Sequence, residues 1–117
     1  MNTAINYLTG RVGQDLELRH TRNQVPFTQL SLAEKRGFRK GDKWEVNAVW
    51  HRFTVWADLA ENAARLLRKG SLIQVCFRID NEHTSVKDHD GVIRERDVPS
   101  LVMTGFEALA DYGKEQE

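Results

Sequence analysis

The chain has 117 residues, of which 40% are hydrophobic, and its 17 basic and 17 acidic side chains give a formal net charge of zero. This length suits one domain, and the hydrophobic content excludes a chain that is disordered throughout. No apolar run reaches the ~20 residues that span a bilayer, residues 1–9 lack the features of a secretory signal, and a single cysteine excludes an intrachain disulfide, so we expect a soluble cytoplasmic protein with no membrane partner.

The first part of the chain predicts two strands followed by a basic loop. Ile5–Val12 is rich in β-favouring residues, which predicts a strand, and Leu16–His20 fits its continuation after a bend. Polar and apolar side chains alternate in Phe27–Ala33, which predicts the second strand. Glu34–Lys43 is predicted to be a basic loop. Its flexible points are Gly37 and Gly41.

Ala48–Trp56 gives the strongest strand signal in the sequence, and because side chains alternate across a strand it has two distinct faces. One face carries Val49, His51, Phe53 and Val55, and the other carries Ala48, Trp50, Arg52, Thr54 and Trp56. Burying the second face would trap the guanidinium of Arg52 without a partner, so we expect this face to be exposed and Phe53 to lie in the core. The alternative is that both tryptophans are core and that the arginine reaches the rim.

A helix is predicted after this strand. Asp58 begins the helix as its N-cap, Glu61 completes a capping box, and Gly70 ends the helix. The apolar face of the helix is formed by Leu59, Ala63, Leu66 and Leu67.

Alternation predicts the last two strands at Leu72–Ile79 and Val98–Phe106. Between them, Asp80–Asp97 is a long polar excursion with Asp90–Gly91 as the tip of a hairpin. Five strands with one helix between strands three and four is the order of an oligonucleotide/oligosaccharide-binding (OB-fold) barrel, an all-β architecture. We therefore expect an OB-fold domain over residues 1–106 and a short, frayed acidic C-terminal end over residues 107–117.

The charge is distributed unevenly along the chain. Residues 1–79 contain 13 basic and 7 acidic side chains, net +6, whereas residues 80–117 contain 4 and 10, net −6. This asymmetry indicates a polyanion-binding site in the first two thirds of the chain, the alternative being ordinary charges scattered over the surface. The predicted loop adds Phe38 to a run of basic side chains, a pattern that suits phosphates and a stacked base, although many such loops are only solvated.

Two indoles around an arginine suit a single-stranded nucleic acid, because unpaired bases stack on flat rings while the cation meets phosphate. Trp50, Arg52 and Trp56 are therefore candidate binding residues, and Trp44 shares their face if the strand extends back without a bulge. The four histidines form no metal motif, and no catalytic constellation is recognisable. We expect no cofactor, no metal and no enzymatic activity.

Five segments of the chain follow one another in a characteristic order. They are Gly10–Arg19 (GRVGQDLELR), Leu30–Ala33 (LSLA), Trp50–Arg52 (WHR), Leu59–Glu61 (LAE) and Leu67–Ser71 (LRKGS). In order and spacing, over about residues 4–79, they resemble the bacterial single-stranded-DNA-binding proteins. The resemblance implies an oligomeric barrel, commonly a homotetramer with a dimer as the alternative, that wraps single-stranded DNA during replication, recombination and repair without catalysis. It also implies association with the nucleoid and with replication or recombination proteins.

Carried over residue by residue, the resemblance places stacking aromatics at Phe38, Trp50 and Trp56, and a subunit-interface histidine at His51. We expect the homo-oligomer to form through the first strand, whose edge must be covered, and through the His51 face. The candidate DNA-binding residues are Phe38, Trp44, Trp50, Trp56, Lys35, Arg36, Arg39, Lys40, Arg52, Arg68, Lys69 and Arg78, and the candidate oligomer-interface residues are Ile5, Tyr7 and His51.

Two departures from the family pattern leave an alternative function open. Asn81–Ile93 is acidic and has no aromatic residue, where the family has another stacking ring. The chain ends at Tyr112–Glu117 without the long tail and acidic tip that recruit partner proteins in the family. The alternative is a primosome-type barrel that acts mainly as a docking module for replication proteins. A nuclease on the same barrel would need a carboxylate cluster or a metal site, which the sequence does not reveal.

Overall fold

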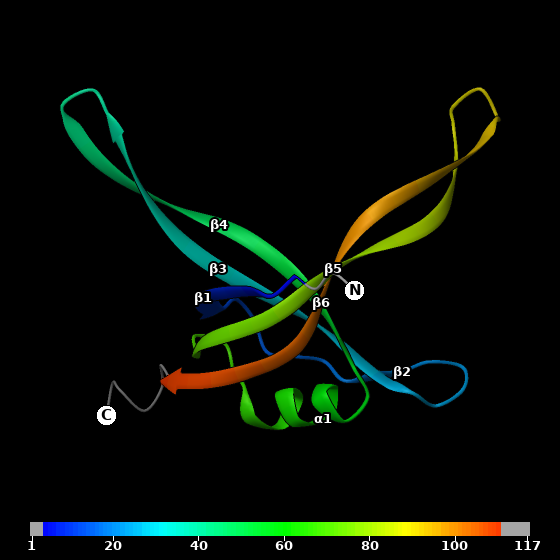
Figure 1. Ribbon diagram of the computed structural model, residues 1–117, viewed down its shortest axis with the longest axis horizontal. Coiled ribbons are helices and arrows are strands. Elements are labelled where there is room, and N and C mark those ends of the chain that lie inside the picture. Colours follow the sequence, from blue (N-terminus) through cyan, green and yellow to red (C-terminus); the bar gives the residue numbers. More distant parts are fainter. Residues whose placement is uncertain (1–3, 111–117) are drawn as a thin grey trace.

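Five strands close into a barrel in the computed structural model, which describes residues 4–110 (Figure 1). They are β1 (Asn6–Val12), β3 (Pro26–Lys40), β4 (Lys43–Trp56), β5 (Leu72–Lys87) and β6 (Ile93–Ala110), and the two-residue strand β2 (Arg19–His20) pairs with the start of β3. The strands follow the order β1-β5-β6-β4-β3-β2, and a second pairing of β1 with β3 closes the barrel. The helix α1 (Ala57–Leu66) lies between β4 and β5. The predicted five-stranded OB-fold barrel is therefore confirmed.

The core is built from the inward-facing side chains of β3, β4 and β5. Fully buried are Leu30 and Leu32 of β3, Phe53 and Val55 of β4, and Ile73 and Val75 of β5. They occur at every second position, as the alternation of a strand requires. The ring of Phe53 also contacts the ring of Phe77 edge to face, with 5.0 Å between centroids. The helix α1 packs against β3 and β4 and buries Ala60 and Ala63.

Two β-ribbons extend from the barrel as arms, one formed by β3 and β4 and the other by β5 and β6 (Figure 1). Strand pairing continues to Lys40 opposite Lys43 in the first arm and to Lys87 opposite Ile93 in the second. The basic loop predicted at Glu34–Lys43 is therefore wrong, because these residues continue the paired strands β3 and β4, whereas the hairpin expected within Asp80–Asp97 is confirmed as a paired ribbon. Gly37 lies inside β3 rather than at a flexible point. Because both faces of a projecting ribbon are in water, consecutive polar residues are tolerated and hide the alternation.

The start of α1 differs from the sequence prediction. Its N-cap is Trp56, which forms no side-chain cap hydrogen bond, so the predicted capping box of Asp58 and Glu61 is wrong. The chain turns into the helix at Ala57, whose φ of +58° places Asp58 inside the first turn. There the carboxylate still interacts favourably with the positive end of the helix dipole.

The helix also ends earlier than predicted. Leu67 is the C-cap and donates its N–H to the carbonyl of Ala63 at 2.9 Å. Gly70 instead donates its N–H to the carbonyl of Val12 at 2.8 Å, which ties the connection to the end of β1. Leu66, predicted to lie on the apolar face, is 49% exposed.

The remaining boundaries differ by a few residues. Of Leu16–His20, predicted to continue the first strand, Arg19–His20 forms β2 and pairs with β3. The predicted tip of the second hairpin is confirmed, since Gly91 donates its N–H to the carbonyl of Asp88 at 2.9 Å. Strand β6 extends through Ala110, and the rest of the expected C-terminal end, residues 111–117, lies outside the described residues. No helix within residues 4–110 is long and apolar enough to cross a membrane.

Candidate nucleic-acid interface

β3 and β4 share one face that carries three exposed indoles, which we call the tryptophan face. Directly opposed residues of an antiparallel pair point to the same side, so the strand register assigns its members. They are Phe27, Gln29, Ser31, Ala33, Lys35, Gly37 and Arg39 of β3, and Trp44, Val46, Ala48, Trp50, Arg52, Thr54 and Trp56 of β4. The exposed fractions are 69% for Trp44, 61% for Trp50 and 43% for Trp56. The three rings are therefore accessible to a flat ligand.

The predicted exposure of this face is confirmed. Trp50, Arg52 and Trp56 are all exposed, whereas Phe53, on the other side of β4, has no exposed surface. The alternative in which both tryptophans belong to the core is therefore wrong, and Phe53 is confirmed as a core residue.

The register also decides the orientation of Trp44. Pairing in the first arm runs without a bulge along the whole of β4, so Trp44 points to the same side as Trp50. At the barrel end, Trp56 lies beside the ring of Phe27 across the strands, with 5.5 Å between centroids. The indoles occupy every sixth position of one strand, which separates them by roughly 20 Å at about 3.3 Å per residue.

The charges on the tryptophan face have one sign. Its ionisable residues are Lys35, Arg39 and Arg52, because both carboxylates of the paired ribbon strands, Glu34 and Glu45, lie on the opposite face. Within residues 4–110, none of these three cations forms an ion pair. Unpaired cations between exposed indoles suit phosphates whose bases stack on the rings.

The opposite face of the first arm has mixed charge. One oxygen of Glu34, Oε1, accepts hydrogen bonds from Arg36 (Nε, 2.9 Å) and from Nε2 of the half-buried His51 (3.0 Å). The hydrogen bond from His51, followed by that from Arg36, lowers the pKa of the Glu34 carboxyl below its ordinary value of 4.5. Phe38 and Lys40 share this face, and Phe38 is 37% exposed. The structure thus separates Phe38, Arg36 and Lys40 from the tryptophans with which the sequence grouped them.

Arg68 and Lys69 lie in the connection between α1 and β5. Their loop is tied to β1 and to the segment that follows it, because Lys69 donates its backbone N–H to Oδ1 of Asp15 at 2.8 Å. The indole of Trp50 lies against Gly13, two residues before Asp15 in the chain. Both basic side chains are exposed. The loop of this predicted pair is thus tied to the segment of residues 13–15 on which the indole of Trp50 rests.

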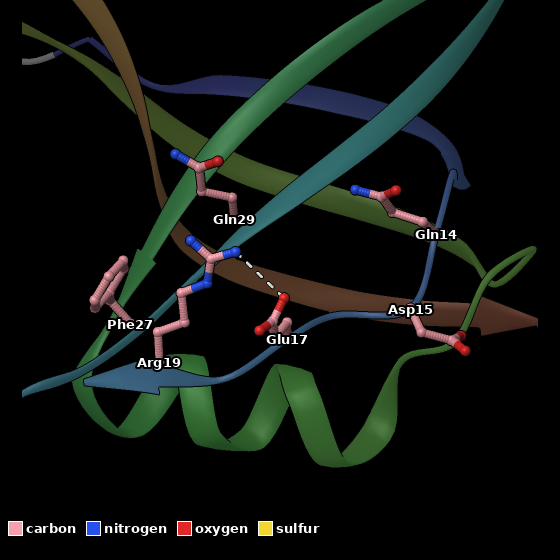
Figure 2. Close-up of a pocket in the computed structure, with 6 residues that line it drawn as sticks. All are labelled: Gln14, Asp15, Glu17, Arg19, Phe27 and Gln29. Carbon is pink, nitrogen blue, oxygen red and sulfur yellow. Dashed lines mark hydrogen bonds and ion pairs between the residues drawn. The ribbon is translucent and has the colours of Figure 1, made fainter.

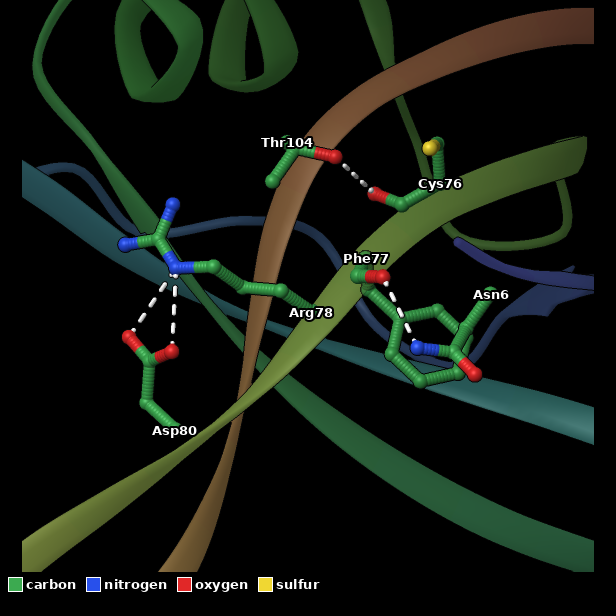
Figure 3. A network of polar contacts seen from close by, with 6 residues as sticks. All are labelled: Asn6, Cys76, Phe77, Arg78, Asp80 and Thr104. Carbon is green, nitrogen blue, oxygen red and sulfur yellow. Dashed lines mark hydrogen bonds and ion pairs between the residues drawn. The ribbon is translucent and has the colours of Figure 1, made fainter. Parts of the chain in front are cut away.

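Arg78 is the one residue of β5 predicted to bind DNA, and its guanidinium already forms an ion pair. Its Nε donates to both carboxylate oxygens of Asp80, at 3.1 and 3.0 Å (Figure 3). It lies opposite Val102 of β6, which in turn pairs with Thr54 of the tryptophan face. Arg78 is thus next to the tryptophan face, but its charge is partly neutralised.

The arginines of the second arm lie on one face of the ribbon. On one side His83 bridges two carboxylates of β6, with Nδ1 3.0 Å from Asp97 and Nε2 3.3 Å from Glu95. The other side, to which Arg78 points, carries Arg94 and Arg96. Asp80 and Glu82 share this second side, so each face of the ribbon carries two carboxylates, and the arginines offset those of one face.

A polar hollow of about 230 Å³ adjoins the Phe27 end of the tryptophan face (Figure 2). It is lined by Gln14, Asp15, Glu17, Arg19, Phe27 and Gln29. Arg19 and Glu17 form an ion pair of 3.3 Å within it. No group of side chains suited to a metal ion occurs among the described residues. Phe27 and Gln29 were not predicted as site residues. Strand pairing sets them beside Trp56 and Thr54, and the alternation of side chains in one strand does not reveal how that strand pairs with the next.

The predicted oligomer-interface residues of the first strand lie on an open edge of the barrel. Ile5 is 67% and Tyr7 is 62% exposed. β1 pairs with β5 along its length but with β3 only at Arg11 and Val12. Within the described part of the chain, the edge of residues 6–10 that faces away from β5 therefore has no strand partner.

Comparison with known proteins agrees with this geometry. The family model described as "Single-strand binding protein family" matches residues 1–108. The chain belongs to this family. It is 28% identical over 122 residues to "Single-stranded DNA-binding protein 1" of Streptococcus pyogenes serotype M18 (strain MGAS8232), covering 94% of this chain and 93% of that protein. It is 35% identical over 85 residues to "Single-stranded DNA-binding protein B" of Bacillus subtilis (strain 168), covering 73% of each.

Some relatives are longer. The chain is 38% identical over 76 residues to "Single-stranded DNA-binding protein" of Streptococcus pyogenes serotype M3 (strain ATCC BAA-595 / MGAS315), covering 65% of this chain and about half, 46%, of that protein. The family resemblance inferred from the sequence motifs is thus confirmed over most of the chain.

Proposed function

We propose that this member of the single-strand binding protein family binds single-stranded DNA on the tryptophan face, without catalysis, in replication, recombination or repair. The observation that carries the proposal is the face itself, in which three exposed indoles alternate with three cations and no carboxylate. The names of its relatives support the same ligand. We place this activity in the cytoplasm, at the nucleoid.

The proposed mechanism is stacking combined with charge neutralisation. Unpaired bases stack on Trp44, Trp50 and Trp56, while Arg52 and the other cations contact the phosphates between them. The bases of a duplex are already stacked on one another, so only a single strand can use the rings. Affinity should also fall with salt, with a log–log slope of about −0.7 for each phosphate neutralised.

A binding titration tests this proposal. Fluorescently labelled single-stranded and duplex oligonucleotides of equal length are titrated with the protein in matched salt. We expect much tighter binding of the single strand. Equal affinity for both forms would overturn the proposal.

We further propose that the protein is a symmetric homo-oligomer, most simply a tetramer or a dimer. The open edge of β1 supports this, because an unpaired strand edge beside the exposed Ile5 and Tyr7 can pair antiparallel with its own copy. Such pairing creates a two-fold axis.

A docking module for replication or recombination proteins is the second candidate. The second arm favours it, because the face that carries His83, Glu95 and Asp97 is exposed, acidic and lacks an aromatic ring. The same titration separates the two candidates, since a docking module need not prefer the single strand.

A further inference from the structure

The backbone conformation does not require glycine at Gly13 and Gly37, two positions that lie against tryptophans of the tryptophan face. Glycines with positive φ, where other residues are strained, occur at Gly41, Gly70 and Gly91 in the described chain. Gly13 and Gly37 are not among them, so alanine would suit the backbone at both positions. Glycine inside a strand, as at Gly37, is otherwise unfavourable.

What occupies the space above each glycine is an indole. A Cβ placed on Gly37 would lie 2.7 Å from Cε2 and 2.8 Å from Nε1 of Trp44. A Cβ placed on Gly13 would lie 2.9 Å from Cη2 of Trp50. Since all these distances are below 3.0 Å, alanine and the present ring position exclude each other. The obstructing atoms belong to side chains rather than to backbone, so the ring would move rather than the strand.

The contacts leave both rings open on their other side. Trp44 is 69% and Trp50 is 61% exposed although each rests on a glycine. An aromatic side chain lying over a glycine of a neighbouring strand is a known stabilising arrangement in sheets. Contact with the backbone restricts the rotamers of the ring without covering the surface that a base needs.

We propose that Gly13 and Gly37 are positioning residues that hold the indoles of Trp50 and Trp44 as preformed stacking surfaces. The inference rests on the proposed function and deepens it. A ring that is already ordered loses less entropy when a base stacks on it, and ordering a free side chain costs part of the binding energy. A methyl group at either glycine displaces the ring and removes this advantage without deleting any DNA-contacting side chain.

A double-mutant cycle tests the proposal at the first arm. Single-strand affinity is measured for Gly37→Ala, for Trp44→Ala and for the double variant. We expect Gly37→Ala to lower affinity about 2- to 10-fold in the wild-type background and to have no further effect once Trp44 is replaced. The matched control is Gly105→Ala, because a Cβ on Gly105 meets nothing within 4 Å and its φ is not positive.

The pair of Gly13 and Trp50 supplies a second, independent cycle of the same design. Melting temperatures of all variants show whether each is folded. The inference would be overturned if Gly37→Ala or Gly13→Ala lowered affinity by the same factor after the corresponding tryptophan had been replaced. Unchanged affinity in both glycine variants would also overturn it.

A readout in the free protein separates this inference from the proposed function. In Trp50→Phe/Trp56→Phe protein, Trp44 is the remaining tryptophan, and Gly37→Ala should increase the quenching of its fluorescence by acrylamide because the ring leaves the backbone. Unchanged quenching would refute the seating of Trp44 on Gly37. If the wild-type protein failed to prefer single strands while this quenching rose, the proposed function would fail and the seating of the ring would stand.

Discussion

Two side chains three positions apart on β4 have opposite environments, since Trp50 is 61% exposed and Phe53 is fully buried. Strand alternation alone produces this difference. It lets one strand supply both the core of the barrel and the surface proposed to bind DNA, so substitutions on the two faces should separate stability from affinity.

Trp50→Ala and Trp56→Ala should each lower single-strand affinity by about 1–3 kcal/mol, roughly five- to 150-fold, because each removes one stacking surface. Both side chains are exposed, so the melting temperature should change little. Phe38→Ala should cost less affinity, because its ring lies on the opposite face of the ribbon. Titration beside thermal melting measures both quantities.

Phe53→Ala is the matched control for this comparison. It leaves a cavity in the core and should lower the free energy of unfolding by ~3–5 kcal/mol. If Trp50→Ala and Trp56→Ala instead lowered the melting point sharply and bound DNA normally, the docking candidate would gain the stronger support.

The lowered pKa of Glu34 predicts that the stability of the fold depends on pH. Its hydrogen bonds hold its folded pKa below 4.5, so in that range the unfolded chain binds this proton more readily than the folded chain. The carboxylate therefore stabilises the fold above about pH 4.5, and this contribution is lost as the pH falls through the lower folded pKa.

Glu34→Gln should accordingly reduce the drop in melting temperature between about pH 6 and about pH 3. The other carboxyl groups titrate in both proteins, so the comparison isolates Glu34. An identical drop in the wild-type protein and the variant would show that the contacts of Glu34 with His51 and Arg36 do not contribute to the fold in solution.

At the scale of elements, the sequence predicts the barrel strands well and the arms poorly. Phe27–Ala33 and Ala48–Trp56 have one buried side, so hydrophobic alternation marks them. Glu34–Lys43 continues the same strands into water, where neither face is buried and the pattern disappears. The alternation of side chains along β4 still placed Trp50, Arg52 and Trp56 correctly on one exposed face, because alternation within a strand does not depend on how that strand pairs with its neighbours.

Register is what the sequence could not supply. It decides that Lys35 and Arg39 share the tryptophan face whereas Arg36 and Lys40 lie behind it, although all four are neighbours in the chain. Contacts formed across strands, such as those of Trp56 with Phe27 and of Trp50 with Gly13, are equally invisible before the chain folds.

The two faces of the first arm offer a charge-matched comparison. Lys35→Ala/Arg39→Ala and Arg36→Ala/Lys40→Ala remove the same net charge from the same ribbon. If the strand lies on the tryptophan face, the first variant should make the log–log salt slope shallower by about 1.4, and the second should leave it nearly unchanged. Equal changes in slope from both variants would mean that the arm acts only as a diffuse positive charge.

At the scale of the whole molecule, the charge is organised by face as well as by position in the sequence. The first 79 residues carry a net +6, and on the first arm their cations lie free of carboxylates on the tryptophan face but beside Glu34 and Glu45 on the opposite face. The two arms diverge from one barrel (Figure 1), and within the described chain the edge of β1 that faces away from β5 has no strand partner at residues 6–10.

Light scattering after gel filtration tests the proposed assembly. A tetramer should have a mass of about 54 kDa, four times the 13.5 kDa of the chain, and a dimer about half of that. Replacing Tyr7 with a charged residue should weaken the assembly, because the side chain is exposed beside the unpaired edge. A protein that stays at 13.5 kDa at micromolar concentration would contradict pairing through β1.

In the proposed mode of binding, unpaired bases stack on the indoles of β4. Intrinsic fluorescence tests it most directly, in three proteins that each keep one of Trp44, Trp50 and Trp56 and have phenylalanine at the other two positions. Each protein is titrated with an oligodeoxythymidylate single strand and with a duplex of equal length in matched salt. We expect the single strand to quench the emission of each indole and the duplex to leave it unchanged. Tight binding of the single strand with unchanged emission from all three would contradict it.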